Sequence, residues 1–206
     1  MNDPNVIKLL IYAVIVASAI FHEYAHAWAA YALGDDTAKR EGRLTLNPLA
    51  HLDPLGTVIV PLFLLFYSGV FIGWAKPVPY NPYALKDQRY GSLKVAAAGP
   101  LTNLIIAVFF GLILRFLEPS IYAPAGFWDF WGFVIYINIF LALFNLLPLP
   151  PLDGSKIFED LFPKFFRQIS ERLGIFGILF AFLAAMFILG PLANIIFRII
   201  TGSLFY

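Results

Sequence analysis

Long apolar stretches separated by polar or proline-rich segments dominate this sequence. Four of them reach the roughly 20 residues that a membrane-spanning helix requires. Between the first two, residues 42–46 alternate between polar and apolar positions, as a short strand would. The predicted spanning helices are residues 6–33, 92–117, 127–147 and 173–201.

A fifth apolar stretch, residues 55–73, is interrupted by a proline and a glycine. It either crosses the membrane or dips in and returns on the same side. If it returns, only Lys8, Arg115 and Arg198 of the 14 Lys and Arg residues lie on one side, and the other eleven share the opposite side. If it crosses, the split is nine to five. Cytoplasmic loops carry the excess of Lys and Arg, so the pattern favours a re-entrant segment and an N-terminus outside the cell.

Composition supports a membrane protein. The chain is 60% hydrophobic and 13% charged, whereas ordinary globular domains are about 45–50% apolar and about 25% charged. The net charge of +1 and the lack of a basic run give no reason to expect nucleic acid. We predict one all-α polytopic domain over residues 1–206 in the cytoplasmic membrane, with four spanning helices, a re-entrant segment and short β-strand loops near the active site.

Three ionisable residues, His22, Glu23 and His26, interrupt the first apolar stretch. Positions i and i+4 of a helix share a face, so both imidazoles can reach one metal ion, with Glu23 beside them to hold a water molecule. Ionisable side chains within a bilayer are costly and are usually functional. The alternative is a polar patch that is hydrogen-bonded to neighbouring helices.

A third metal ligand has to come from elsewhere in the chain. There are no cysteines, so His, Asp and Glu are the available ligands. Asp153 ends a proline-broken stretch after the third predicted span, and alone the Asp153-Gly154 pair fits an interfacial turn. Together with the two histidines, it favours a three-ligand zinc site with an open fourth position, which is typical of catalytic zinc. We expect one zinc per chain, on the cytoplasmic side.

These motifs resemble those of the site-2 protease family of intramembrane zinc metalloproteases, in particular compact prokaryotic members without a PDZ or CBS domain. Three family motifs occur in the family's order. They correspond to His22, Glu23 and His26; to Gly99, Pro100 and Asn103; and to Asn145, Pro148, Asp153 and Gly154.

The resemblance implies regulated intramembrane proteolysis: hydrolysis of peptide bonds within or near transmembrane segments, with single-pass membrane proteins as substrates. Glu23 would be the general base for a zinc-activated water. Asn145 would donate a hydrogen bond to the oxyanion; alternatively, it pairs with backbone carbonyls freed by Pro148. Asn103 would lie near the substrate, or else form a helix–helix hydrogen bond. Residues 42–46 and 74–83 could offer edge strands to an unwound substrate.

Two other functions fit the composition. A transporter or channel would use the charged cluster as an ion path, and an inactive zinc-binding scaffold would hold another membrane protein. The concentration of polar residues at one depth argues against the first, and the intact Glu23 argues against the second. His51 could bind a second metal, gate the site or cap the re-entrant segment, but a hydrogen-bonded loop histidine is the simpler interpretation.

Overall fold

The computed structural model of the chain describes residues 3–69, 71, 73–116 and 126–203. In this part of the chain, four helical runs are long and apolar enough to cross a membrane, which confirms the predicted all-α polytopic fold. They are α1 (Pro4–Ala32), α5 (Gly91–Phe116), α6 (Phe127–Asn145) and the run Phe182–Thr201. The last run joins the end of α8 (Pro163–Ala184), the π-helix η3 (Ala185–Leu189) and α9 (Gly190–Thr201). Residues 117–125, where the second and third predicted spans join, lie outside the described residues.

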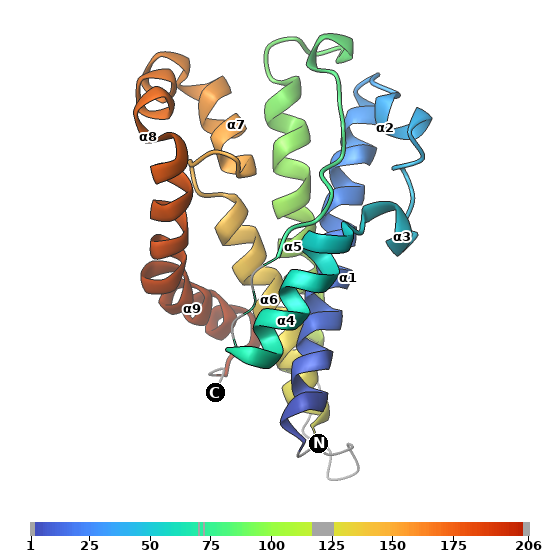
Figure 1. Cartoon of the computed structure of the whole chain (residues 1–206), viewed down its shortest axis with the longest axis vertical. Coiled ribbons are helices and arrows are strands. Elements are labelled where there is room, and N and C mark those ends of the chain that lie inside the picture. Colours follow the sequence, from blue (N-terminus) through green and yellow to red (C-terminus); the bar gives the residue numbers. More distant parts are fainter. Residues whose placement is uncertain (1–2, 70, 72, 117–125, 204–206) are drawn as a thin grey trace.

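Helices α1 and α6 run in the same direction, and α5 runs against both of them (Figure 1). Helix α9 packs on α5 and α6, and Ala107, Ile135 and Phe197 are buried where these three helices meet. Small residues permit this close packing, as is common between membrane helices. At Gly111 of α5, an added Cβ would collide with Ile200 of α9.

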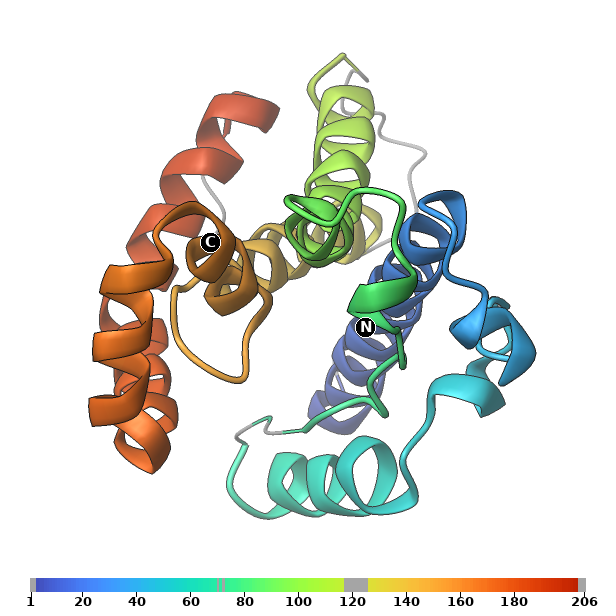
Figure 2. The ribbon, with the colours of Figure 1, turned by 90° about the horizontal axis from the view of Figure 1, so that it is seen from above.

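The interrupted stretch at residues 55–73 forms a short helical segment, which is made of the π-helix η1 (Pro54–Ile59) and α4 (Val60–Tyr67). Their 6 and 8 residues rise about 21 Å, which is less than the roughly 30 Å of a bilayer core. The chain then returns, because the Trp74 N–H donates to the Gly56 carbonyl at 2.9 Å. This path is the one that a re-entrant segment would take, and Figure 2 shows the segment on one side of α1.

The predicted short strands are wrong: none of the residues that the structure describes is in a strand. After α2 (Thr37–Arg40), the chain turns at Gly42, whose φ is 68°, and the Arg43 N–H donates to the Ala38 carbonyl at 2.8 Å. Residues 74–81 are also irregular, and η2 (Pro82–Ala84) follows them. A strand needs a partner strand for its backbone hydrogen bonds, whereas these loops bond to helix ends, side chains and turns.

The C-terminal third contains more helix than the sequence pattern predicts. Residues 148–172, between the third and fourth predicted spans, hold α7 (Asp153–Leu161) and the start of α8. The φ of 32° at Gly174 then breaks the helical path within α8. Helix α6 ends at Asn145, before the proline-rich turn and two residues earlier than predicted. The π-helix η3 directly precedes α9.

Candidate metal centre

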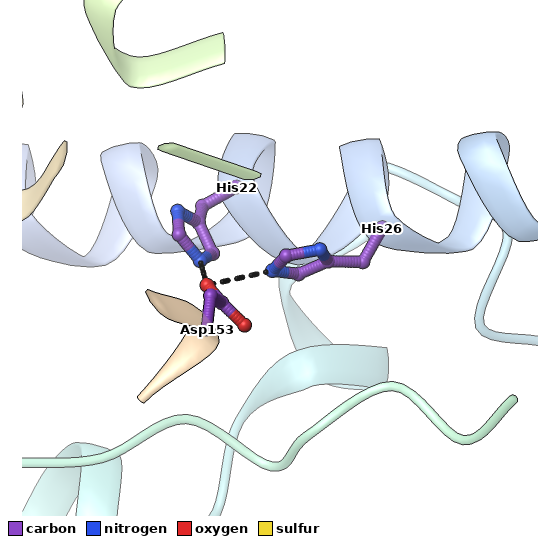
Figure 3. Close-up of side chains that lie close together, drawn as sticks. All are labelled: His22, His26 and Asp153. Atoms are coloured by element: carbon purple, nitrogen blue, oxygen red, sulfur yellow. Dashed lines mark hydrogen bonds and ion pairs between the residues drawn. The ribbon is translucent and has the colours of Figure 1, made fainter. Parts of the chain in front are cut away.

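Helices α1 and α7 bring three potential ligands together (Figure 3). His22 and His26 lie one turn apart on α1 and point in the same direction, and Asp153 is the first residue of α7. The Asp153 Oδ2 atom lies 3.0 Å from His22 Nε2 and 3.2 Å from His26 Nε2. Among the described residues these three form a group whose ligand atoms all lie within 4.8 Å of one another.

The position of Asp153 follows from the packing of α7 against the end of α6. A Cβ at Gly154 would collide with the carbonyl oxygens of Leu146 and Leu147, so only glycine lets α7 begin this close to α6. The Ser155 N–H and hydroxyl both donate to the Leu152 carbonyl, which fixes the first turn of α7. The carboxylate is thereby held at the depth of the two histidines.

The outer ring nitrogens of the histidines are already engaged. His26 Nδ1 lies 2.7 Å from the Val95 carbonyl, so this nitrogen must be the donor. His22 Nδ1 lies 2.6 Å from Asn103 Oδ1 and donates in the same way. In the neutral imidazole the Nε2 atom then carries the lone pair, and both Nε2 atoms face Asp153. This is the orientation that hydrogen-bonded partners impose on metal-ligating histidines.

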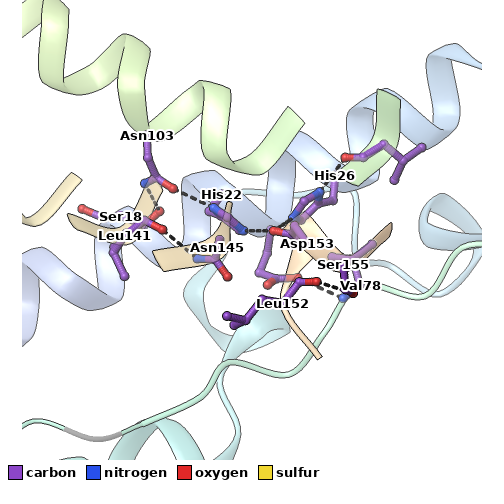
Figure 4. A network of polar contacts seen from close by, with 12 residues as sticks. Ser18, His22, His26, Val78, Asn103, Leu141, Asn145, Leu152, Asp153 and Ser155 are labelled. Atoms are coloured by element: carbon purple, nitrogen blue, oxygen red, sulfur yellow. Dashed lines mark hydrogen bonds and ion pairs between the residues drawn. The ribbon is translucent and has the colours of Figure 1, made fainter. Parts of the chain in front are cut away.

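A buried amide network fixes Asn103 itself (Figure 4). Asn103 Nδ2 donates to Asn138 Oδ1 at 2.8 Å and to the Ser18 carbonyl at 3.3 Å. Asn138 Nδ2 in turn donates to Ser18 Oγ at 2.9 Å. All three side chains are buried. Because the atom of the Asn103 amide that donates to Asn138 Oδ1 must be the nitrogen, the other atom is the oxygen. That oxygen faces His22.

A zinc ion fits this donor set. Two neutral imidazoles and one carboxylate match the ligands of catalytic zinc sites, whose ligands lie about 3.3 Å apart in tetrahedral geometry. Helix α5 leaves space beside both rings at Gly99: an added Cβ would lie 2.5 Å from His26 Nε2 and 2.6 Å from His22 Nε2.

The charges also favour a cation. The Asp153 carboxylate meets two ring nitrogens whose protons are on the opposite side of each ring. Three converging acceptors repel one another unless a positive charge lies between them.

A cavity of about 550 Å³ opens beside this cluster. His22, His26 and Asp153 line it together with Glu23 and Asn145. Glu23 Oε2 accepts a hydrogen bond from the Val78 N–H at 3.0 Å. Both predicted catalytic side chains thus share one cavity with the predicted ligands.

The two predicted asparagines differ in their surroundings. Asn145 lines the cavity, and its Nδ2 donates to the Leu141 carbonyl at 2.9 Å. Asn103 is fully buried behind His22 and is not among the residues that line the cavity, which fits the helix–helix alternative better than contact with substrate. His51 lies in α3 (Pro48–His51) and bonds through Nε2 to the Thr45 carbonyl at 2.7 Å.

Sequence reasoning missed Ser18, Asn138 and Val78. Ser18 is one turn before His22, and Asn138 is a polar residue in the middle of an apolar helix, so both carried a signal for a polar contact inside the membrane. Val78 carried no such signal, because its contribution is a backbone N–H.

Comparison with known proteins identifies the family of this chain. The family model for peptidase family M50 matches residues 116–189, which include Asn145 and Asp153. "Putative zinc metalloprotease YwhC" of Bacillus subtilis is 42% identical over 200 residues, which cover 91% of this chain and 88% of that protein. No solved structure matches.

Two more distant relatives carry similar names. "Putative zinc metalloprotease MJ0611" of Methanocaldococcus jannaschii is 33% identical over 76% of this chain and 74% of its own length. "Putative zinc metalloprotease Rip2" of Mycolicibacterium smegmatis is 34% identical over 73% of this chain and 56% of its own length. The chain therefore belongs to peptidase family M50, the site-2 proteases, and is a multi-pass membrane zinc metalloprotease.

Proposed function

We propose that this protein is an intramembrane endopeptidase that hydrolyses peptide bonds within or near the transmembrane segments of other membrane proteins. The observation that carries the proposal is the convergence of His22, His26 and Asp153 on one wall of a cavity that Glu23 also lines. A metal site that only stabilises a fold is closed by four protein ligands, whereas three ligands beside a cavity leave a position for water or substrate.

His22, His26 and Asp153 would hold one zinc per chain. When bound, zinc supplies Lewis-acid polarisation and lowers the pKa of water to about 7. The remaining chemistry belongs to the chain. Glu23 accepts a proton from the attacking water and delivers it to the nitrogen of the leaving amine. Its carboxylate suits this task because it lies in the cavity and next to His22 in the sequence.

Asn145 would stabilise the negative charge that develops on the carbonyl oxygen of the substrate. Its amide nitrogen has two N–H groups, and one of them is used on the Leu141 carbonyl. The second N–H is available to the cavity. An N–H that is already oriented by a first hydrogen bond is the kind of donor that acts in an oxyanion hole.

The substrate has to present an unwound stretch, since the peptide bonds of an intact helix are hydrogen-bonded internally. The irregular segment of residues 73–81 borders the cavity and is a candidate for pairing with it. Within the described part of the chain, the N–H and carbonyl of Ala75 have no hydrogen-bond partner, and Ala75 lines the cavity. Pairing at this residue would bring an extended substrate close to Glu23.

The protein would act in the cytoplasmic membrane as one domain, with its N-terminus outside and its substrates single-pass proteins that undergo regulated intramembrane proteolysis. The basic residues of α2 and of the loop before α5 support this orientation, because they lie at the end of the molecule opposite the N-terminus (Figure 1). An excess of Lys and Arg marks the cytoplasmic side.

Zinc content and peptide cleavage together test the proposal. The wild type, Glu23→Gln and Asp153→Ala are purified in detergent, analysed for zinc and incubated with transmembrane peptides that carry a fluorophore, a quencher and a central Gly-Gly. We expect one zinc and cleavage for the wild type, and zinc without cleavage for Glu23→Gln, with a loss of at least about 100-fold in rate. Asp153→Ala should lose both.

The exposed Asp129, at the start of α6, provides the matched control for loss of a carboxylate. Asp129→Ala should keep its zinc and its activity. A folded wild type without zinc would contradict the proposal and favour a transporter. A zinc-loaded wild type that cleaves none of the peptides would favour a scaffold.

A further inference from the structure

Val78 lies between two prolines in the sequence Pro77-Val78-Pro79. Proline has no backbone N–H, so Val78 supplies the sole N–H donor of this tripeptide. That N–H donates to Glu23 Oε2 at 3.0 Å, across 55 residues of sequence.

Hydrogen bonds hold the residues that precede Val78 in place. Thr57 Oγ donates to the Trp74 carbonyl at 2.8 Å, and the Trp74 N–H donates to the Gly56 carbonyl at 2.9 Å. Two residues further on, the Lys76 N–H donates to the His51 carbonyl at 3.1 Å. These contacts fix the approach to Val78 on the re-entrant segment and on α3.

Hydrogen bonds also hold the residues that follow Val78 in place. The Asn81 N–H donates to Asp35 Oδ2 at 2.6 Å. Asp35 is fully buried and holds the other oxygen against the N–H and hydroxyl of Thr37, at the start of α2. The Val78 N–H therefore belongs to a segment that hydrogen bonds hold in place on both sides. The prolines before and after Val78 restrict its backbone further.

Glu23 has no other fixed partner in the described part of the chain. Its Oε2 accepts the Val78 N–H, and its Oε1 has no hydrogen-bond partner there. A glutamate side chain rotates about three bonds, so a carboxylate without a partner would sample many positions in the cavity. A charge-assisted bond to a rigid backbone donor selects one of them and leaves Oε1 available for water.

We infer that the backbone N–H of Val78 is a positioning group for Glu23, and that the Pro77-Val78-Pro79 sequence serves to aim this single donor. The inference rests on the proposed role of Glu23 as general base. It assigns residues 73–81 a task besides lining the cavity: the segment that borders the substrate also orients the base. The side chain of Val78 is secondary in this role.

Three variants at one position separate the N–H from the side chain. Val78→Pro removes the N–H and keeps an apolar side chain, and it creates a run of three prolines, which favours an extended backbone. Val78→Ala removes most of the side chain and keeps the N–H. The third replaces Val78 with its α-hydroxy analogue by cell-free translation, which changes one amide to an ester. The ester removes the N–H, keeps the side chain and weakens the Pro77 carbonyl as an acceptor, which Arg43 contacts at 3.5 Å.

Zinc content, thermal midpoint, kcat and KM are measured for each variant with the labelled transmembrane peptides. We expect Val78→Pro and the ester to keep their zinc and to lose about 10- to 100-fold in kcat with little change in KM, because a general base out of place forfeits part of its contribution. The kcat of Val78→Ala should exceed that of Val78→Pro at least about 10-fold. If Val78→Pro fails to fold, the kcat of the ester variant alone tests the role of the Val78 N–H.

The outcomes distinguish this inference from the proposed function. Equal kcat values for the ester and the wild type would overturn the inference and leave the protease intact. A rise in KM without a fall in kcat would also overturn it, since the segment would then only bind substrate. A zinc-loaded wild type that cleaves no peptide would contradict the proposed function, and the inference with it.

Discussion

The Asn103 side-chain oxygen lies 2.6 Å from Nδ1 of His22, on the side of the ring opposite Asp153. Asn103 comes from α5 and His22 from α1, so this hydrogen bond couples the packing of two spanning helices to the orientation of one candidate ligand. The same asparagine is anchored to α6 through Asn138. Packing of the three helices thus positions Asn103 Oδ1, which accepts the proton of His22 Nδ1 and leaves the lone pair on His22 Nε2.

Loss of this hydrogen bond should weaken zinc binding. We predict that Asn103→Ala lowers zinc affinity by about 10- to 100-fold, the usual cost of removing the partner of a metal-ligating histidine. Asn103→Asp, which keeps an oxygen facing Nδ1, should recover part of the loss. Competition with a chelator measures the Kd for zinc. An unchanged Kd in Asn103→Ala would show that the amide network serves helix packing alone.

A substitution at Gly99 tests whether zinc occupies the space beside the rings of His22 and His26. A methyl group there would lie 2.5 Å from His26 Nε2. We predict that Gly99→Ala reduces zinc affinity at least about 100-fold, because the added carbon competes for the volume between the ligands. Gly190→Ala is the matched control, since the nearest atom to its Cβ would be Tyr136 Oη at 3.9 Å. Normal zinc content in Gly99→Ala would show that the metal does not bind in the space beside α5.

Asn145 distinguishes a donor to the oxyanion from a donor to the helix end. If it binds the oxyanion, Asn145→Ala should lower kcat by about 100- to 1,000-fold and leave zinc content unchanged. If it only satisfies the Leu141 carbonyl, which it contacts at 2.9 Å, the variant should lower the thermal midpoint and retain its kcat. We expect the first result. Kinetics with the labelled peptides and thermal unfolding in detergent separate the two.

Asp35 should make stability depend on pH. Burial raises the pKa of its carboxyl, but hydrogen bonds from Thr37 and Asn81 outweigh this and lower it below the usual value. A lowered pKa stabilises the fold above the unfolded pKa of about 3.9, and the stabilisation is lost as the pH falls through the folded pKa. We predict that Asp35→Ala costs about 1–3 kcal/mol at pH 7.

The neighbouring Asp36 is the control for this prediction. Its side chain is 55% exposed and forms an ion pair with Arg40 at 3.1 Å, and such exposed pairs contribute little to stability. Thermal midpoints of the wild type and both variants between pH 3 and pH 7 measure the effect. The difference between wild type and Asp35→Ala should shrink below pH 4. A difference that is constant with pH would mean that the carboxylate charge does not matter.

Much of this architecture was predictable because its causes are local. The lengths of the apolar stretches predict four spanning helices, and the structure describes four helical runs of that kind. The distribution of Lys and Arg predicts that residues 55–73 re-enter, and the hydrogen bond between Trp74 and Gly56 shows that the chain turns back after this segment. The strand prediction for residues 42–46 failed for a non-local reason. An alternating pattern gives a strand only where another strand lies beside it.

The sequence by itself determined that His22, Glu23 and His26 lie together on one helix, since the helical repeat acts over a single turn. Only the tertiary structure decided what they face. Asp153 lies 131 residues from His22, Asn103 lies 81 residues away, and Val78 reaches Glu23 across 55 residues. Their contacts depend on how α1, α5 and α6 pack and on where the chain turns back. No local pattern specifies these, because a pattern of apolar positions defines which face is buried and not its neighbour.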